Sequence, residues 1–205
     1  MKPDVFHTIF IVSFLSFIGI RLYYHRRARQ EGGRMNARDT RFSILLRLVL
    51  AIPLAGFLVA YMIRPAILGW AEIPLPEWVP WLGAAMVVVS FALLIWVHQA
   101  LGANFNTVLG VRDRHTLVTR GPYHLVRHPM YGVLFLFMVG LLLLTGNLLI
   151  GGALLAGLLG TVGTRVAKEE AILEEEYGEE YRLYKARTGR FLPRLSSLAQ
   201  SPLDS

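Results

Sequence analysis

The sequence predicts an all-α integral membrane protein with five transmembrane helices, the last two forming a helical hairpin, followed by a cytoplasmic amphipathic C-terminal helix. Of its 205 residues, 54% are hydrophobic and only 17% are charged, and the mean hydropathy is +0.47. Apolar runs long enough to cross a bilayer recur along the chain, and arginines gather between these runs. A soluble domain of this length would carry more charge and shorter apolar runs. We therefore expect one membrane domain over residues 1–205.

The first three predicted spans are continuous apolar runs at residues 5–24, 42–63 and 79–101. Each is long enough for ~30 Å of hydrocarbon at about 1.5 Å per residue. The first run precedes arginines, the reverse of the charge order of a cleaved signal peptide, so we expect it to be retained. Arg47 lies early in the second run, and we expect its side chain to extend to the cytoplasmic interface.

The last two spans are predicted from one apolar block that is interrupted at Thr145-Gly146-Asn147. Gly-Asn is a turn signal, so we divide the block into arms at 131–145 and 147–164. Each arm is near the lower length limit, which implies tilt or local thinning of the bilayer. The small residues of 151–163 are typical of close helix packing in lipid.

Charge predicts the orientation. Seven arginines lie in the loop 21–41, four more lie in the loop 102–130, and the segment after Thr164 is also basic. On the opposite side, Lys2 and Arg64 are the basic residues. The positive-inside rule therefore predicts an external N-terminus and a cytoplasmic C-terminus, an arrangement that five spans satisfy and that four or six do not. The net charge of +7 then favours contact with anionic lipid rather than nucleic acid.

Polar, rigid and aromatic residues concentrate at the predicted water–lipid boundary, in the stretch Gly121-Pro-Tyr-His-Leu-Val-Arg-His-Pro-Met-Tyr-Gly132. Pro129 suits the first turn of a helix and keeps His128 out of it, so His128 is predicted at the cap of the fourth span. Free backbone N–H groups there, beside Arg127 and His128, would seat a carboxylate or phosphate. The alternative is that Arg127 and His128 are interfacial anchors.

A second polar segment is predicted at 165–195, where the fifth span ends. Arg165 and Glu169 lie four residues apart on one helical face, and Glu170 points about 100° away from Glu169. A plain surface ion pair is the alternative reading of Arg165 and Glu169. Apolar and aromatic residues then form the stripe of an amphipathic helix that is broken at Gly178, a pattern more typical of packing than of ligand stacking. The stripe comprises Leu173, Tyr177, Tyr181 and Tyr184.

The histidines do not predict a metal site. His7, His25 and His98 are isolated, and His115 and His124 are either part of the polar site or solvated loop residues. The chain has no cysteine, which excludes disulfides, thiolate ligands and cysteine nucleophiles. No pair of histidines is expected at i, i+4 spacing on one helix. The polar stretch 196–205 is predicted to be a flexible tail.

Four motifs together resemble the isoprenylcysteine carboxyl methyltransferase family, part of a wider group of integral membrane methyltransferases that includes phospholipid methyltransferases. The resemblance covers about residues 98–195, including the closing Phe191-Leu-Pro-Arg194, and the first two spans carry no signature. The motifs are specific in combination and spacing. They are His115-x-Leu-Val-Thr-x-Gly-Pro-Tyr123, Arg127-His-Pro-x-Tyr131, Arg165-x-x-x-Glu-Glu170 and Tyr177-Gly-Glu-Glu-Tyr-Arg-x-Tyr184.

The resemblance implies S-adenosyl-L-methionine as methyl donor, S-adenosyl-L-homocysteine as product and no metal, with the donor held between 102–130 and 165–195. It implies that Arg165 and Glu170 face the reacting centre as catalytic residues. The donor carboxylate suits Arg127 and His128, and ribose hydroxyls suit Glu169. Tyr123, Leu125, Val126 and Tyr131 would enclose the adenine. The full implied cofactor-binding set is His115, Leu117, Val118, Gly121, Tyr123, Leu125, Val126, Arg127, His128, Pro129, Tyr131 and Glu169.

The resemblance further implies in-line methyl transfer to a lipophilic acceptor that enters from the bilayer, either a prenylcysteine-type carboxylate or a lipid-like small molecule. Arg165 would orient a carboxylate acceptor, whereas Glu170 would take the proton from an amine or hydroxyl.

Two other classes of function remain open. Membrane sterol-type reductases share this architecture and a related Arg-His-x-x-Tyr stretch, and they would use NADPH. The Glu169-Glu170 pair and the lack of a further basic cluster for a 2′-phosphate favour the methyltransferase. A transporter or structural partner would carry polar residues at the span midplanes, where this chain has little beyond three serines, Ser13, Ser16 and Ser90.

Overall fold

The computed structural model describes residues 3–31, 35–37, 41–105, 110–112 and 116–194. The chain divides into two compact units, each assembled from separate stretches of sequence. The first comprises Met1–Arg21, Asp39–Ala92 and Leu134–Thr161, and the second comprises Leu22–Arg38, Leu93–Val133 and Val162–Ser205. Four long helices each contribute residues to both units, namely α1 (Pro3–Glu31), α3 (Val79–Leu101), α5 (Pro129–Thr145) and α6 (Ala153–Tyr177).

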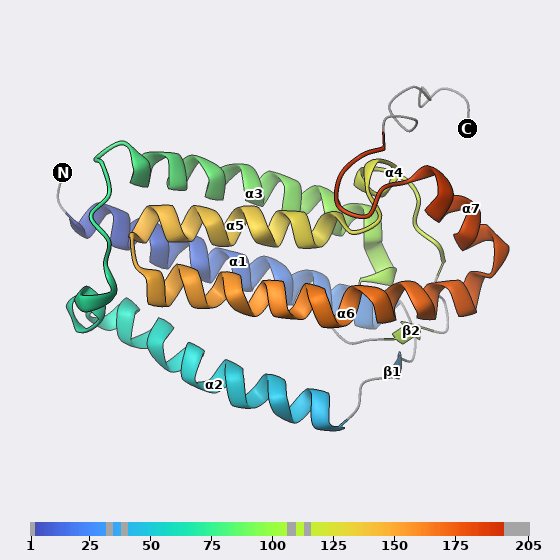
Figure 1. Cartoon of the computed structure of the whole chain (residues 1–205), viewed down its shortest axis with the longest axis horizontal. Helices are drawn as coiled ribbons and strands as arrows, with labels where there is room; N and C mark the ends of the chain where they lie inside the picture. The colour runs from blue at the N-terminus through green and yellow to red at the C-terminus, as the bar shows by residue number, and fades with distance from the viewer. Residues whose placement is uncertain (1–2, 32–34, 38–40, 106–109, 113–115, 195–205) are drawn as a thin grey trace. The chain divides into compact units, whose positions relative to one another are not determined.

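The architecture is helical, as predicted, with one antiparallel pairing of two three-residue strands (Figure 1). The long helices are α1 (Pro3–Glu31), α2 (Arg41–Ile63), α3 (Val79–Leu101), α5 (Pro129–Thr145) and α6 (Ala153–Tyr177). The short elements are β1 (Met35–Ala37), η1 (Pro65–Ala71), η2 (Gly102–Asn104), β2 (Gly110–Arg112), α4 (Pro122–Leu125), η3 (Leu148–Gly152) and α7 (Glu179–Arg187).

Several of these helices are suited to a membrane. Three are long and apolar enough to cross one, at Val5–Glu31, Val79–Asn104 and Leu148–Tyr177. A fourth candidate joins the end of α2 to η1, which turns by 117° from it, and α5 is a shorter apolar helix. The chain is therefore an integral membrane protein, while the count of five spans and the orientation stay predictions.

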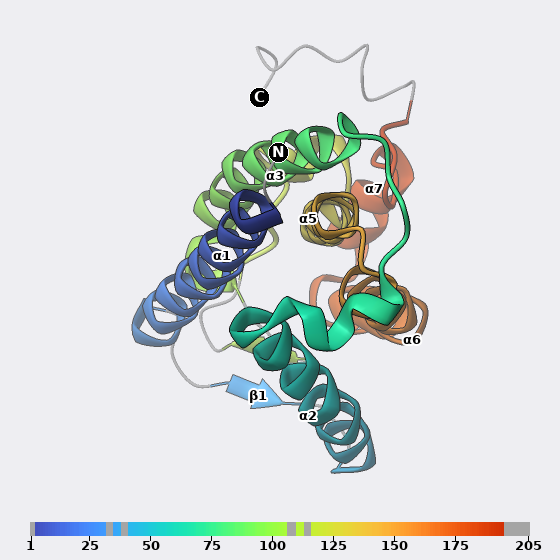
Figure 2. The same cartoon turned by 90° about the vertical axis from the view of Figure 1, so that its left-hand side faces the viewer.

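The first unit has an apolar core. Phe10 and Tyr61 from α1 and α2 pack with Val87 of α3 and with Phe137 and Leu141 of α5, and all five side chains are buried. Figure 2 shows this unit end-on, with α1 and α3 on one side of α5 and α6 on the other. A ring stack at 4.2 Å joins Phe17 of α1 to Phe137.

Small residues allow two close approaches in this unit. A Cβ at Gly83 would lie 2.4 Å from the backbone nitrogen of Leu144, and one at Gly151 would lie 2.4 Å from the Cα of Leu142. The predicted small-residue packing of 151–163 is thus confirmed at Gly151. It is wrong for the glycines further along α6, because a Cβ at Gly157 would meet nothing within 4 Å.

The turn predicted in the hairpin is confirmed. Helix α5 ends at Thr145, Gly146 takes a left-handed φ of +61°, and Asn147 begins the next helical segment. The Asn147 side-chain oxygen accepts hydrogen bonds from the backbone N–H groups of Leu149 and Ile150 in η3, while its amide donates to the Leu68 carbonyl at 2.8 Å. Helix α6 then continues to Tyr177 rather than ending near residue 164, so the polar segment begins inside one unbroken helix.

The second unit contains the predicted break at Gly178, where φ is +53° and α7 begins at the next residue. Glu174 of α6 accepts hydrogen bonds from Arg182 at 3.1 Å and Lys185 at 3.2 Å, which ties α7 back onto α6. Tyr181 and Tyr184 are buried, so these two tyrosines pack the helix, as expected.

Candidate active site

The site in the second unit begins with a backbone pairing between the motif before α5 and the chain after α7. The Arg127 N–H donates to the Gly189 carbonyl at 2.8 Å, and the His128 N–H donates to the Arg190 carbonyl at 3.1 Å. Glycine is required at 189, because a Cβ there would lie 1.9 Å from the Leu192 oxygen. The backbone amides of Arg127 and His128, which precede the first residue of α5, are therefore occupied by carbonyl groups of this chain.

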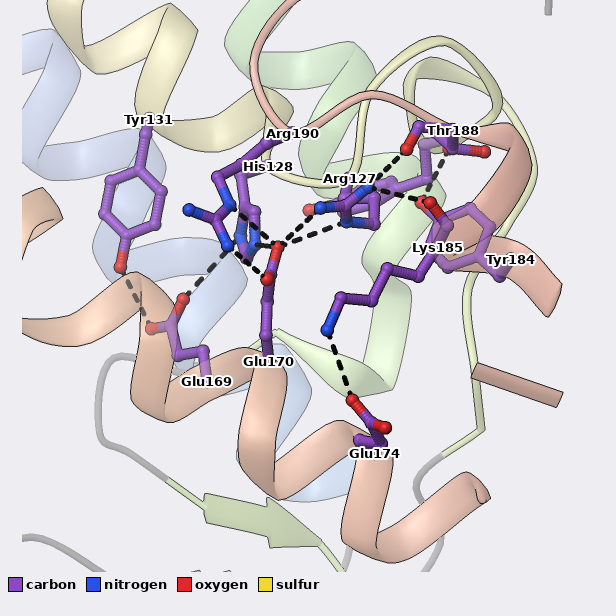
Figure 3. Close-up of polar contacts among 11 residues, drawn as sticks. Arg127, His128, Tyr131, Glu169, Glu170, Glu174, Tyr184, Lys185, Thr188 and Arg190 are labelled. Atoms are coloured by element: carbon purple, nitrogen blue, oxygen red, sulfur yellow. Dashed lines mark hydrogen bonds and ion pairs between the residues drawn. The ribbon is translucent and has the colours of Figure 1, made fainter. Parts of the chain in front are cut away.

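Arg127 is a buried structural cation. Its side chain is 6% exposed, and Nη2 and Nε donate to Glu170 Oε1 at 2.9 and 3.1 Å (Figure 3). Its Nη1 donates to the carbonyl oxygens of Lys185, at 3.2 Å, and Thr188. A guanidinium at this depth is stable only when its charge and its N–H groups are satisfied, and these partners satisfy them. The reading of Arg127 as an interfacial anchor is wrong.

Arg190 is a site residue that the sequence did not reveal. Its Nε donates to Glu170 Oε1 at 3.1 Å and its Nη2 to Oε2 at 2.6 Å, a two-pronged contact. The Arg190 side chain is 48% exposed, whereas that of Glu170 is 4% exposed. Figure 3 shows the Glu170 carboxylate held between the Arg127 and Arg190 guanidinium groups. Glu170 is thus an ionised anchor at the centre of the cluster.

His128 is buried against the same carboxylate. Its Nε2 lies 3.3 Å from Glu170 Oε1, and its Nδ1 lies 3.8 Å from Glu169 Oε2. Burial lowers the pKa of His128 to about 4, and the neighbouring Arg127 and Arg190 charges add to that shift against the opposing effect of Glu170. The ring is neutral near pH 7, and with Nε2–H donating to Glu170, Nδ1 is an acceptor.

Glu169 gathers a second set of contacts one residue earlier on α6. Its Oε1 accepts from the Tyr131 hydroxyl at 2.9 Å and from Arg165 Nη2 at 3.2 Å. The Arg165 and Glu169 side chains are 16% and 25% exposed. The predicted i, i+4 pair therefore exists, but it is part of a half-buried cluster with Tyr131 rather than a plain surface ion pair.

The remaining predicted residues belong to the same unit. The Tyr123 carbonyl accepts from the Tyr184 hydroxyl at 2.7 Å, and Gly121 opens α4 with φ +61°. Pro129 is buried at the first position of α5, as predicted. The four apolar residues of the predicted cofactor-binding set are half-buried, namely Leu117, Val118, Leu125 and Val126. His115 lies outside the described residues.

The cluster has a surplus of positive charge. Three guanidinium groups, from Arg127, Arg165 and Arg190, face the two carboxylates of Glu169 and Glu170, and the imidazole among them is neutral. An anionic group on a ligand would balance this surplus. Within the part of the chain that the structure describes, no group of three histidine, aspartate or glutamate side chains could hold a metal ion.

Comparison with known proteins shows what this chain is similar to. Residues 82–175 match the model of the isoprenylcysteine carboxyl methyltransferase family. This segment is therefore similar to that family by sequence. It contains both halves of the cluster, from Arg127 to Tyr131 and from Arg165 to Glu170, and ends before Arg190.

Individual members of the family show how far the likeness extends. The human protein-S-isoprenylcysteine O-methyltransferase is 33% identical over 126 residues, which are 60% of this chain and 44% of the human protein. A probable protein-S-isoprenylcysteine O-methyltransferase of Oryza sativa subsp. indica is 28% identical over 163 residues, 78% of this chain and 83% of the rice protein. This chain thus spans less than half the length of its human relative.

A solved structure of the eukaryotic intramembrane Ras methyltransferase of this family shares the fold. The two superpose with a TM-score of 0.56 at 19% identity, over 92% of this chain and 68% of the other. At this identity the likeness concerns the fold alone.

Proposed function

We propose that this chain is a membrane methyltransferase that transfers a methyl group from S-adenosyl-L-methionine to a lipophilic acceptor, with S-adenosyl-L-homocysteine as product. One observation carries the proposal. The segment that matches the family contributes Arg127, His128 and Tyr131 from one end of α5 and Glu169 and Glu170 from α6, and these residues form one hydrogen-bonded cluster.

The donor-binding roles follow from which groups have hydrogen-bonding capacity left. Arg127 is buried and its guanidinium is occupied by Glu170 and two carbonyl groups, so we assign it to positioning. Arg190 is half-exposed, and its contacts with Glu170 use Nε and Nη2, which leaves donors on Nη1. We therefore assign the amino-acid carboxylate of the donor to Arg190, beside His128, and the ribose hydroxyls to Glu169.

The acceptor class follows from the state of Glu170. S-adenosyl-L-methionine supplies a sulfonium-bound methyl group for in-line displacement, which needs no metal and no covalent intermediate. A carboxylate acceptor is already ionised at neutral pH and needs no base, whereas an amine or hydroxyl acceptor requires one. Glu170 is buried and bonded through both oxygens to guanidinium groups, so it is a poor proton acceptor. We therefore favour an ionised carboxylate on a lipophile, of the prenylcysteine type or a smaller lipid-like acid, oriented by Arg165.

The proposed topology keeps five spans, with the N-terminus outside and the cluster in the cytoplasm. Helix α5, with 17 residues, would extend about 25 Å at ~1.5 Å per residue, which is shorter than ~30 Å of hydrocarbon and suits a locally thinned bilayer. The donor would then arrive from water and the acceptor from the lipid.

Calorimetric titration of the purified protein tests this function. We expect S-adenosyl-L-homocysteine to bind and NADPH not to bind, and we expect labelled methyl groups to pass from the donor into a lipid or membrane-protein extract. Binding of NADPH alone would instead identify a reductase, and binding of neither ligand would contradict an enzymatic role at this site. Fractionation of the labelled products would then identify the acceptor.

A further inference from the structure

A cavity of about 420 Å³ lies in the first unit, among residues that the proposed methyl transfer does not use. Its volume is in the range of sites that bind small molecules. The walls come from several helices and two loops. They include Phe6 and His7 of α1, Tyr61 of α2, Glu72 after η1, Thr145 at the end of α5 and Gly146 after it.

The aromatic part of the wall is held in place by neighbouring rings. The His7 and Tyr61 rings meet edge-to-face at 5.5 Å, and Phe6 meets Trp81 edge-to-face at 5.3 Å. His7 Nε2 lies 2.9 Å from the Tyr61 carbonyl oxygen, which can only accept, so Nε2 carries the proton. The wall therefore offers ring faces.

Charge favours a cationic ligand. Among the lining residues, which are all described, Glu72 is the one with a charged side chain, and it is exposed. A carboxylate beside aromatic faces, with no lysine or arginine in the wall, is the usual environment for an ammonium group. A phosphate or a free carboxylate would instead be repelled by Glu72.

Exposed tryptophans indicate that the ligand is a lipid headgroup. Trp70, Trp78 and Trp81 lie in the segments that frame the cavity and are 76%, 64% and 49% exposed. Tryptophan at this level of exposure in a membrane protein is typical of the interface, where the ring sits among headgroups. Helix η1 turns by 117° from α2, as expected for a segment that leaves the hydrocarbon and follows the interface. The cavity is thus at headgroup depth.

We propose that this cavity binds the ammonium headgroup of a zwitterionic phospholipid, with the Glu72 carboxylate as counter-ion and the Tyr61 and Phe6 rings against the ammonium. The residues that line the cavity are not residues of the methyl-transfer cluster. The proposal does not depend on methyltransferase activity.

Native mass spectrometry of the detergent-purified full chain tests the proposal. The probes are phosphatidylethanolamine and phosphatidylcholine, with phosphatidylglycerol of the same acyl chains as the anionic comparison. We expect wild type to retain the two zwitterionic lipids and to bind them about tenfold more tightly than phosphatidylglycerol. Glu72→Gln should remove most of this tenfold preference, which corresponds to about 1.4 kcal/mol.

The matched control is Glu77→Gln, which removes an acidic side chain from the same loop but not from the cavity wall. Its lipid preference should equal that of wild type, and both variants should keep the unfolding temperature of wild type. Equal losses in the two variants would overturn the proposal in favour of a general surface-charge effect. Equal binding of all three lipids by wild type would overturn it without reference to any variant.

Discussion

Removal of the Arg190 guanidinium should selectively weaken the binding of ligands that carry an amino-acid carboxylate. Arg190 is half-exposed, and two of its nitrogens hold Glu170 while Nη1 has donors for a ligand. A hydrogen bond to a charged group contributes about 1.5–3 kcal/mol, and solvent screening at a half-exposed site favours the lower end. We therefore expect Arg190→Ala to weaken S-adenosyl-L-homocysteine binding about tenfold.

A second ligand separates this contact from a general disturbance of the site. 5′-Methylthioadenosine keeps the adenine, the ribose and the sulfur of S-adenosyl-L-homocysteine but lacks its amino-acid carboxylate. Titration calorimetry should show that Arg190→Ala weakens the binding of 5′-methylthioadenosine little, while it weakens the binding of S-adenosyl-L-homocysteine about tenfold. Equal losses for both ligands would refute direct contact with the carboxylate and leave Arg190 as a structural partner of Glu170.

The control variant is Arg182→Ala, which removes an arginine of α7 that is 61% exposed and pairs with Glu174 and Glu179 instead of Glu170. It should bind both ligands as wild type does. If wild type binds neither ligand, the proposed function itself fails, an outcome that differs from a selective failure of the Arg190 assignment.

Three further predictions concern the stability of the site. Arg127→Ala should lower the free energy of unfolding by about 3–5 kcal/mol, because it leaves the buried Glu170 carboxylate with one arginine fewer. A thermal melt in detergent that matches wild type would contradict this. The folded-state pKa of His128 is about 4, below its ordinary 6.5, so the free energy of unfolding should fall as the pH drops from 6.5 to 4. The fall should be smaller in His128→Asn. An equal fall in both proteins would show that other groups dominate. Gly189→Ala should lower both melting temperature and ligand affinity because its Cβ would lie 1.9 Å from a backbone oxygen, whereas Gly157→Ala, with nothing within 4 Å, should be tolerated.

Much of the secondary structure was predictable because its causes are local. Pro129 begins α5 since a proline fits the first turn of a helix and disfavours helical backbone before it. Gly146 and Gly178 end or interrupt helices with positive φ, a conformation that glycine adopts without steric cost. The pair of Arg165 and Glu169 also follows from helical spacing alone.

Local reasoning was less successful for the end of the second hairpin arm. The apolar run ends near residue 164, but α6 continues to Tyr177 because the residues that follow are mostly good helix formers. A change in hydropathy marks a change of surroundings, and it need not coincide with the end of a helix.

The sequence by itself determined a helical membrane protein and most of the polar residues in the candidate site. The partners of those residues were decided by tertiary structure. Glu170 receives Arg127 from 43 positions earlier and Arg190 from 20 positions later, and the backbone amides of Arg127 and His128 pair with the carbonyls of Gly189 and Arg190. No helical or strand period connects such positions, because they meet only when the chain after α7 folds back onto the start of α5. Burial then requires the Arg127 charge to be neutralised inside the protein, which converts a predicted ligand-binding arginine into a structural one.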